Sequence, residues 1–495
     1  MGRRASDPFA RKPIETLLRE MDGGERLHRV LGPVALMALG VGATIGAGIF
    51  VLTGEAAKND AGPSLILSFL LAGVGCGFAA LCYSELASMV PVAGSAYTYA
   101  YATLGELMAW IIGWDLVLEY AIGSAAVAVG WSKYLAAFFQ NQLGIVLDPR
   151  WLNSPWDFDA KAHTFVWNRV AVELADRTTV HVQAYGNVPA LLIMLAITAI
   201  LVVGIRESAT FNAAMVAVNL AVILLVIALG ATYVEPGNWR PFLHKDHGWK
   251  GVSLGAAHIF FAYIGFDSIS THAEEAKNPR RDLAIGILGS LLICTVLYVA
   301  VAAILTGMVP YGSIDVNAPI ASAFQVHGTT WASGLITVAI LAGITSSLLV
   351  GTLSQPRILL AMARDGMLPH SFFGAVHPRF LTPWKSTILV GLIVGAISAL
   401  VPLNFLADLV SVGTLFAFLV VCAAVLVLRR RSPEIARPFR VPALPVVAGL
   451  GLLVNGGLIF SLGPDNWIRL IAWLALGLAI YFGYGRYHTR LEPEG

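Results

Sequence analysis

Long runs of hydrophobic residues, separated by short polar stretches, follow one another along almost the whole chain. A run of about 20 apolar residues is long enough to cross the core of a bilayer as a helix. Counting such runs predicts about twelve membrane-spanning helices. Their expected ranges are 33–56, 62–90, 102–136, 187–206, 210–234, 252–273, 283–308, 331–361, 384–402, 404–428, 442–462 and 466–485.

The first of these runs contains a glycine-rich stretch, VGATIGAGIF at residues 41–50. Glycine is a poor helix former, so this stretch predicts an interruption of the first span. Non-helical backbone inside a bilayer is tolerated only where it faces a cavity or a ligand. A broken span presents free N–H groups and carbonyls together, and these suit a carboxylate and an ammonium. Alternatively, the same glycines form a small-residue face for close helix packing.

A second interruption is predicted in the sixth span, at FFAYIGFDS, residues 260–268. It places Gly265 and Asp267 at mid-membrane, where an ionisable group costs about 2.5–3.5 kcal/mol unless it is solvated or paired. The first and sixth spans cross in opposite directions, which is the sequence trace of an inverted repeat of five plus five spans. We therefore predict an all-α integral membrane protein with discontinuous helices 1 and 6 and two extra C-terminal helices.

This organisation divides the chain into five parts. They are an N-terminal tail (1–28), a first inverted repeat (29–234), a second inverted repeat (235–428), spans 11 and 12 (429–485) and a C-terminal tail (486–495). The side that holds the N-terminus collects more than twice as many lysines and arginines as the other side. The positive-inside rule therefore predicts a multi-pass protein of the plasma (inner) membrane with both termini in the cytoplasm.

Three segments outside the spans have their own expected roles. The longest loop, 137–186, is rich in tryptophan and is expected to form a folded cap on the outer side. The arginine run 429–431 is expected to anchor the tenth span to anionic membrane lipid. The stretch 13–21 is expected to lie on the membrane as a short amphipathic helix.

Composition excludes several classes of protein. With 57% hydrophobic and 13% charged residues and a mean hydropathy of +0.74, the chain cannot be a soluble domain. A net charge of +2 argues against a nucleic-acid partner. All four cysteines lie in apolar runs and are expected to be core residues, not disulfides or metal ligands.

No catalytic motif stands in a suitable context. The GxSxG match at 251–255 opens an apolar helix instead of joining a strand to a helix. The chain contains no G-x-x-x-x-G-K-[ST] phosphate-binding loop, which argues against ATP-driven pumping. We therefore predict a protein that is not an enzyme and has no metal or cofactor.

Several motifs, taken together, carry a likeness to a known family. They are GATIGAGIFV, YSELASMVPVAGSAYTYAY, GWDLVLEYAIGSAAVA, FFAYIGFDSISTHAEEAKNPRRDLAIGI, LSQPRILLAMARDGMLP, ADLVSVGTLFAF and LRRRSPEIARPFRVPALP. The chain resembles the amino acid–polyamine–organocation superfamily of transporters over residues 28–485, and within it the cationic amino acid transporter group. The resemblance implies twelve spans in the inverted-repeat fold and uptake of L-amino acids, without sodium in bacterial relatives that use protons.

The resemblance also implies roles for residues at the two breaks. The amides of the first break would hold the substrate carboxylate, and carbonyls of both breaks would hold the α-ammonium. Phe261 resembles the aromatic residue that covers bound substrate as the outer gate, although a phenylalanine in an apolar span is commonly plain core. The substrate-binding residues expected on these grounds are Thr44, Ile45, Gly46, Ala47, Gly48, Phe261, Ala262 and Ile264.

A cationic substrate side chain would need negative potential beyond the backbone groups. Glu119, Asp115 and Asp267 are the candidates in the spans. Ser347, in the eighth span, matches a small hydroxyl position of the cationic group, where a bulky apolar residue would shorten the pocket. The small residues around it alternatively serve close helix contacts.

Coupling to an ion is implied in two forms by the family. In some proton-coupled relatives a lysine of the fifth span acts, but this chain has no lysine there and Asn219 takes the corresponding place. Glu119 and Asp267 remain as candidate proton carriers, because burial raises the pKa of a carboxyl group. In sodium-coupled relatives hydroxyls of the eighth span hold the ion, and Thr345 and Ser346 are the candidates here.

These features predict a secondary active transporter that imports L-amino acids, cationic ones and small neutral ones such as alanine, with protons as the coupling ion. A facilitated uniporter or an exchanger of the same fold is the alternative mechanism. A membrane-embedded amino acid sensor or a channel is the alternative class. The order of substrates, the oligomeric state and any small membrane-spanning accessory subunit are left open by the sequence.

Overall fold

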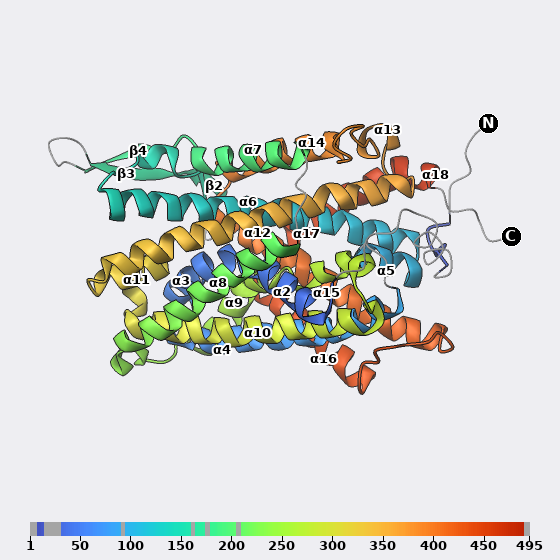
Figure 1. The fold of residues 1–495 in the computed structure, drawn as a ribbon, viewed down its shortest axis with the longest axis horizontal. Coiled ribbons are helices and arrows are strands. Elements are labelled where there is room, and N and C mark those ends of the chain that lie inside the picture. Colours follow the sequence, from blue (N-terminus) through green and yellow to red (C-terminus); the bar gives the residue numbers. More distant parts are fainter. Residues whose placement is uncertain are drawn as a thin grey trace.

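The structure is a computed structural model that describes residues 7–13, 31–90, 95–159, 164–173, 179–203 and 209–489. Within these residues, long helices run side by side along the longest axis of the molecule (Figure 1). Helix α18 (Arg486–His488) lies at one end of the bundle and four short strands lie at the other. We call these two ends the terminal side and the cap side.

The described residues include nine helical segments long and apolar enough to cross a membrane and three shorter apolar helices. These segments account for the twelve predicted spans. In chain order they are α2 (Pro33–Thr44) with η1 (Gly48–Leu52), α3 (Thr53–Ala56) and η2 (Ala57–Ala61); α4 (Leu65–Met89); α6 (Glu106–Leu143); α7 (Val188–Val203); α8 (Ala209–Gly230); α9 (Gly248–Ile259) with η7 (Phe260–Tyr263) and η8 (Phe266–Glu275); α10 (Pro279–Met308); α12 (Thr330–Arg364); α14 (Trp384–Leu400); α15 (Leu403–Arg431); α16 (Leu444–Ser461); and α17 (Pro464–Ile480) with η10 (Tyr481–Gly485).

Shorter elements connect these spans. They are η3 (Gly62–Ser64), α5 (Ser95–Thr103), η4 (Pro149–Trp151), η5 (Ala231–Tyr233), η6 (Pro236–Trp239), η9 (Tyr311–Ser313), α11 (Pro319–Val326) and α13 (His370–Phe373). The described part of the chain is therefore mostly helical, as predicted.

The third span differs most from its predicted range of 102–136. Gly105 has a φ of +106°, which L side chains rarely adopt, and it separates α5 from α6. Helix α6 runs to Leu143 and ends at Gly144, which is left-handed. Its 38 residues extend over about 57 Å, so α6 projects well beyond a hydrocarbon core of about 30 Å.

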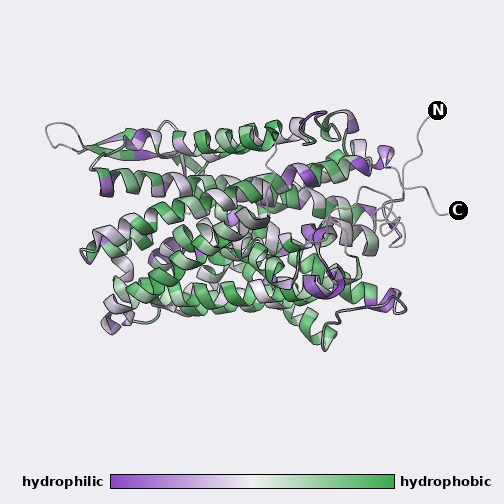
Figure 2. Cartoon of the chain, in the orientation of Figure 1, coloured by the Kyte–Doolittle hydropathy of each residue, from purple (hydrophilic) through white to green (hydrophobic). Residues whose placement is uncertain are grey.

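The bundle has a buried centre and an apolar outer surface. Helix α6 packs against α12 and α15, and α10 packs against α4 and α2. Large apolar side chains on the outer helices face away from the protein, among them Leu292 (66% exposed) and Leu453 (72% exposed). Figure 2 shows hydrophobic residues along the lengths of the helices and hydrophilic residues gathered toward the ends. This surface is the one expected to contact lipid.

The long loop after α6 is folded, as predicted. It contains two antiparallel hairpins, formed by β1 (Trp156–Asp159) with β2 (Thr164–Trp167) and by β3 (Arg169–Glu173) with β4 (Thr179–Gln183). Their strands are paired in register, so Trp156 faces Trp167, and the two indole rings stack with centroids 3.9 Å apart. The cap is thus a small β structure attached to a helical membrane domain.

One arginine fastens this cap to the spans. The guanidinium of Arg469 on α17 lies 3.8 Å from the ring centroid of Phe405 on α15 and 4.4 Å from that of Phe158 on β1. We expect Arg469→Lys to lower the unfolding free energy by about 1 kcal/mol, because lysine lacks the planar group that stacks on two rings. Thermal unfolding of the purified protein would measure this, with the exposed Arg169→Lys as control. Equal stability of the two variants would contradict the expectation.

The arginine run at the end of α15 does not serve lipid alone. Arg429 makes two hydrogen bonds to the carboxylate of Glu85 on α4, from Nε at 3.0 Å and Nη2 at 2.5 Å. The Nε atom of Arg437 lies 3.3 Å from the same carboxylate, and the Val441 amide donates to it. Glu85 is 1% exposed, so an unpaired charge there would be costly. The prediction that Arg429 binds lipid is therefore wrong, because Arg429 neutralises a buried carboxylate.

The described part of the N-terminal tail lies against the spans. The carbonyl of Ala10 accepts a hydrogen bond from the Glu106 amide at 2.9 Å, and Lys12 pairs with Asp365 at 3.1 Å. The remainder of the predicted amphipathic stretch, 14–21, lies outside the described residues. The four cysteines are free and buried, as predicted.

Candidate functional site

The first span is broken where the glycine-rich stretch predicted. Helix α2 ends at Thr44, and Ile45 has extended backbone angles, with φ −77° and ψ 99°. The chain resumes a helical course at Gly48, the first residue of η1. The first N–H groups of a new helix have no partner within it, so this break offers donors to a ligand.

The sixth span is broken at the corresponding place. Helix α9 passes into the 3-10 turn η7, and Ile264 then takes extended angles, with φ −64° and ψ 134°. Gly265 follows with φ +123°, which strongly favours glycine. The chain turns helical again at Phe266. The predicted interruption of helices 1 and 6 is therefore confirmed.

The two breaks touch through their backbones. A Cβ atom added to Gly48 would lie 2.4 Å from Cα of Ala262, and one added to Gly265 would lie 2.7 Å from the carbonyl carbon of Ala43. No side chain fits at either point without displacing backbone. The glycines of both breaks thus allow two interrupted helices to meet.

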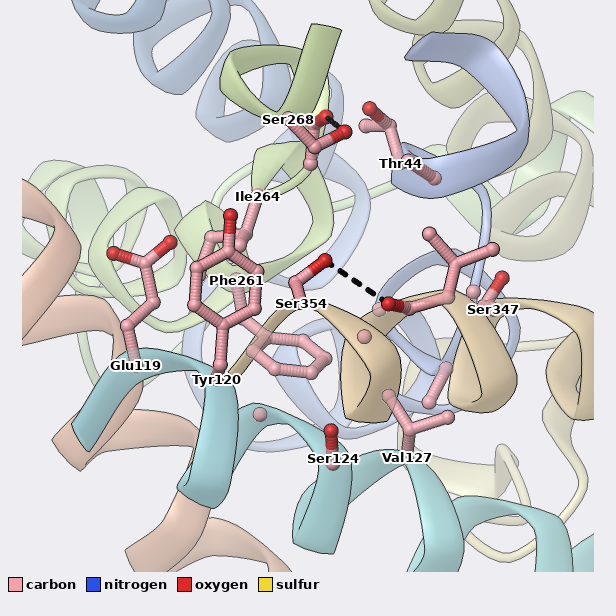
Figure 3. Close-up of a pocket in the computed structure, with 18 residues that line it drawn as sticks. Thr44, Glu119, Tyr120, Ser124, Val127, Phe261, Ile264, Ser268, Ser347 and Ser354 are labelled. Atoms are coloured by element: carbon pink, nitrogen blue, oxygen red, sulfur yellow. Dashed lines mark hydrogen bonds between the residues drawn. The ribbon is translucent and has the colours of Figure 1, made fainter. Parts of the chain in front are cut away.

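A cavity lies beside this contact, between α6, α12 and the two breaks (Figure 3). Its empty volume is about 620 Å³, open space at its mouth included. In Figure 3, Glu119 and Tyr120 stand on one side of the cavity and Ser347 stands on the other. The residues that line it are Ala43, Thr44, Gly46, Ala47, Gly48, Glu119, Tyr120, Gly123, Ser124, Val127, Phe261, Ile264, Gly265, Ser268, Ser347, Val350, Gly351 and Ser354.

Ser347 ties α12 to the first break. Its hydroxyl donates to the carbonyl of Ile45 at 2.8 Å and to that of Gly42 at 3.3 Å. A Cβ atom on Gly46 would lie 3.4 Å from the Ser347 side chain. The side chain therefore satisfies carbonyls that the broken helix leaves free, and it forms part of the cavity wall.

Glu119 brings a carboxylate to the cavity. It is 2% exposed, and its Oε1 atom is buried and has no hydrogen-bond partner among the described residues. Asp115, one turn earlier on α6, is fully buried but does not line the cavity. Since an uncompensated buried charge is costly, the Glu119 carboxyl needs either a proton or a cation beside it.

Most of the predicted substrate-binding residues do meet at this cavity. Those that line it are Thr44, Gly46, Ala47, Gly48, Glu119, Phe261, Ile264 and Ser347. Ile45 and Ala262 belong to the breaks but face the protein core, with 0% and 1% exposure. These two residues can therefore contribute main-chain groups to the breaks, while their side chains pack in the core.

Asp267 has a different position from the one expected. It is not among the residues that line the cavity, and its Oδ1 accepts a hydrogen bond from the Gly265 amide at 3.3 Å. This contact closes the turn that starts η8. The side chain therefore supports the second break and does not form part of the cavity wall.

The other coupling candidates lie apart from the cavity wall. Thr345 donates to the Leu341 carbonyl at 2.7 Å and accepts from the Trp131 indole at 3.0 Å, so it faces α6. Asn219 is buried beside Gly343, where an added Cβ would overlap its Oδ1. Ser346 is half-buried and is not a lining residue.

Several lining residues were not singled out from the sequence. Tyr120, Ser124 and Val127 follow one another on α6 at helical spacing, and Gly351 and Ser354 follow Ser347 on α12 in the same way. Gly351 lies four residues after Ser347, and Ser354 lies three residues after Gly351, so all three residues share one face of the helix. This periodicity could have identified these lining residues from the sequence, once Ser347 and Glu119 had been taken as the first residue on each helix face.

The comparisons with known proteins agree with this architecture. The chain matches the amino acid permease family over residues 31–480. It is 44% identical to the branched-chain amino acid permease BcaP of Bacillus subtilis, over 98% of this chain and 99% of that protein. It is 43% identical to the methylthioribose transporter of the same organism, over 98% of this chain and 100% of that protein.

A plant relative also belongs to a group of amino acid transporters by name. The chain is 41% identical to the vacuolar cationic amino acid transporter 4 of Arabidopsis thaliana, over 86% of this chain and 67% of that protein. The predicted resemblance to the cationic amino acid transporter group is thereby confirmed. With its two interrupted helices and a match that covers nearly the whole chain, this multi-pass membrane protein belongs to the amino acid permease family of the amino acid–polyamine–organocation superfamily.

Proposed function

We propose that the protein imports L-amino acids, cationic ones and small neutral ones, by alternating access and with coupling to protons. Membership of the amino acid permease family supports amino acid transport. The observation that carries the finer proposal is the buried carboxyl group of Glu119, whose Oε1 atom has no hydrogen-bond partner among the described residues, at a cavity beside two broken helices. A site of this kind can hold a zwitterion and, in addition, one positive charge.

The backbone of the two breaks suits the common part of every amino acid. The amides of Ala47 and Gly48 lie at the start of η1, where the partial positive charge of a helix favours a carboxylate. Carbonyls of Ala262 and Ile264 are the proposed acceptors for the α-ammonium. The Thr44 carbonyl already accepts a hydrogen bond from Tyr298 at 2.9 Å, so it has less capacity left for the substrate.

Glu119 would discriminate by charge. A cationic substrate side chain that reaches along α6 would pair with its carboxylate, while a neutral substrate would leave the carboxyl group protonated. With alanine the site would carry a proton, and with arginine the substrate cation would take the place of that proton, so an alkaline interior would drive accumulation of alanine and not of arginine. A uniporter or an exchanger of the same fold would show no accumulation driven by a pH gradient.

We also propose an orientation and a domain division. The terminal side is assigned to the cytoplasm and the cap side to the exterior of the plasma membrane, on the strength of the distribution of positive charge. The repeats are assigned to residues 29–234 and 235–428, each beginning with a broken span.

Proteoliposomes provide the test. Purified protein would be assayed with labelled arginine, lysine, alanine and leucine, first without a gradient, then with an alkaline interior, then with sodium. We expect saturable uptake specific for L isomers, and accumulation of alanine and leucine only with the pH gradient. Binding without flux would indicate a sensor, non-saturable flux would indicate a channel, and equal alanine uptake with and without the gradient would reject proton symport.

The length of the pocket is tested at Ser347. We expect Ser347→Met to reduce arginine uptake about tenfold and to leave alanine uptake within about threefold, because a longer apolar side chain shortens the cavity. Initial rates over a range of substrate concentrations measure both effects. Ser347→Ala, which removes the hydroxyl but adds no bulk, is the control. Equal loss of both substrates in the methionine variant would reject the assignment of this pocket.

A further inference from the structure

A second cavity lies on the cap side of the first one. It is lined by Leu52, Glu55, Ala56, Asn59, Asp60, His258, Asn404, Ala407 and Asp408, and its empty volume is about 510 Å³. Leu52 lies four residues after Gly48 along the first span, and His258 lies three residues before Phe261 along the sixth. One helical turn, about 5.4 Å, therefore separates this outer cavity from the substrate cavity along both spans.

One imidazole connects three elements in this cavity. The Nδ1 atom of His258 on α9 lies 2.7 Å from Oδ2 of Asp60 on η2. Its Nε2 atom lies 3.3 Å from Oδ1 of Asp408 on α15. His258 thus holds the first, sixth and tenth spans together immediately above the substrate cavity.

The contacts favour the protonated form of this histidine. A carboxylate oxygen can only accept a hydrogen bond, and a neutral imidazole has only one N–H to donate. With a carboxylate near each ring nitrogen, the imidazolium cation is the form that can donate to both, so the two contacts favour the protonated ring. Loss of its proton would leave two aspartates facing one another with a neutral ring between them.

The other charged groups nearby reinforce this arrangement. Glu55 on α3 faces the same cavity, and its Oε2 atom is buried and has no hydrogen-bond partner among the described residues. Lys133 on α6 acts electrostatically on Glu55, and Arg469 on α17 acts on Asp408. Of the other helices packed on α9, α16 has no charged residue. The charged residue of α4 is Glu85, which is held by Arg429.

We propose that His258, between Asp60 and Asp408, is a proton-binding site whose occupancy closes the cap side above the substrate cavity. The His258 side chain is 29% exposed, so protons can reach it through the outer cavity. The sign follows from the contacts. The closure is present when the ring is charged and is lost as the pH on the cap side rises through the titration of the ring. This inference rests on the proposed alternation between two open sides, but it does not require that protons drive uptake.

Accessibility of a single thiol tests the proposal. Leu52 lines the outer cavity and is 4% exposed, so Leu52→Cys reports whether the cavity opens. The four native cysteines are buried and give little background with a membrane-impermeant maleimide. Ala136→Cys, in a separate cavity on the same side, corrects for thiol ionisation. The labelling rate of Leu52→Cys relative to Ala136→Cys should rise about tenfold between about pH 6 and pH 9.

Two variants of His258 separate the effect of the charge from the effect of side-chain shape. With His258→Gln, the relative labelling should be high at every pH, because no cation joins the aspartates. With His258→Arg, which is charged at every pH, it should stay low throughout. If His258→Gln does not yield folded protein, Asp408→Asn should show the same loss of protection.

Two results would contradict the proposed role of His258. An unchanged pH dependence in His258→Gln, or equal labelling of the glutamine and arginine variants, would overturn the proposal. The measurement uses no substrate and no gradient. Failure of proton-driven uptake in the wild type would therefore reject the proposed function and leave this result unaffected.

Discussion

Replacing Gly48 with alanine is expected to abolish uptake. The added Cβ would lie 2.4 Å from Cα, 2.6 Å from Cβ and 2.9 Å from the amide nitrogen of Ala262. Three atoms of the sixth span would have to move, and two of them are backbone. Overpacking of this kind costs about 1–3 kcal/mol or more, and every 1.4 kcal/mol is a factor of ten in an equilibrium. The breaks would separate and displace the amides proposed to hold the substrate carboxylate.

The initial rate of labelled alanine uptake in proteoliposomes measures this effect, and we expect a loss of more than about tenfold. Gly77→Ala is a matched control, because Gly77 lies in helix α4 and an added Cβ meets no atom within 4 Å. Its uptake should equal that of the wild type, and its stability should be unchanged or slightly higher. Wild-type uptake by Gly48→Ala would show that the contact between the two breaks has no role in transport.

The second large effect is expected from Glu119→Gln. The substitution keeps the size of the side chain and removes its charge. The amide cannot bind a proton and carry it inward with a neutral substrate, so accumulation of alanine driven by an alkaline interior should fall to the level seen without a gradient. Arginine uptake should fall by more than about tenfold, in line with the loss of a charge-assisted contact of about 1.5–3 kcal/mol. Alanine should still equilibrate across the membrane.

Asp115→Asn is the matched control, since Asp115 lies one turn away on the same helix, is equally buried and does not line the cavity. The Asp115→Asn variant should retain accumulation driven by the pH gradient and the wild-type ratio of arginine to alanine uptake. The comparison uses arginine and alanine uptake at equal protein density, with and without the pH gradient. Normal gradient-driven accumulation by Glu119→Gln would exclude Glu119 as the proton carrier.

The inner and outer cavities lie one helical turn apart along the first and sixth spans. The wall of the inner cavity is formed by the two broken helices and by side chains of α6 and α12, among them the carboxyl group of Glu119. Three relatives of similar sequence are named for different substrates. The names refer to branched-chain amino acids, to methylthioribose and to cationic amino acids. The side chains on α6 and α12 are therefore the first place to look for the determinants of substrate choice.

Local sequence was sufficient for the spans and for their interruptions. Apolar runs have a length fixed by the bilayer, and a glycine cluster inside such a run has few explanations. Residues 41–50 and 260–268 thus located both breaks, and the break at Gly265 required a residue that tolerates positive φ. The start of α6 was missed by a few residues, because Gly105 gave no signal stronger than the other glycines.

What each polar side chain faces was decided only by tertiary structure. Glu119 and Asp267 looked alike in the sequence, since both are carboxylates in apolar spans, yet one lines the cavity and the other caps a turn. Arg429 looked like a lipid anchor until Glu85, 344 positions away, was brought beside it. His258 gained its two aspartates in the same manner.

The chain alone therefore determined that this is a membrane protein with two broken helices, because hydrophobic length and glycine content act over a few neighbouring residues. Which charges are paired, and which remain free for a ligand, depends on groups contributed by distant spans. In a low-dielectric interior that pairing decides whether a charge is stable, and only the packed structure shows it.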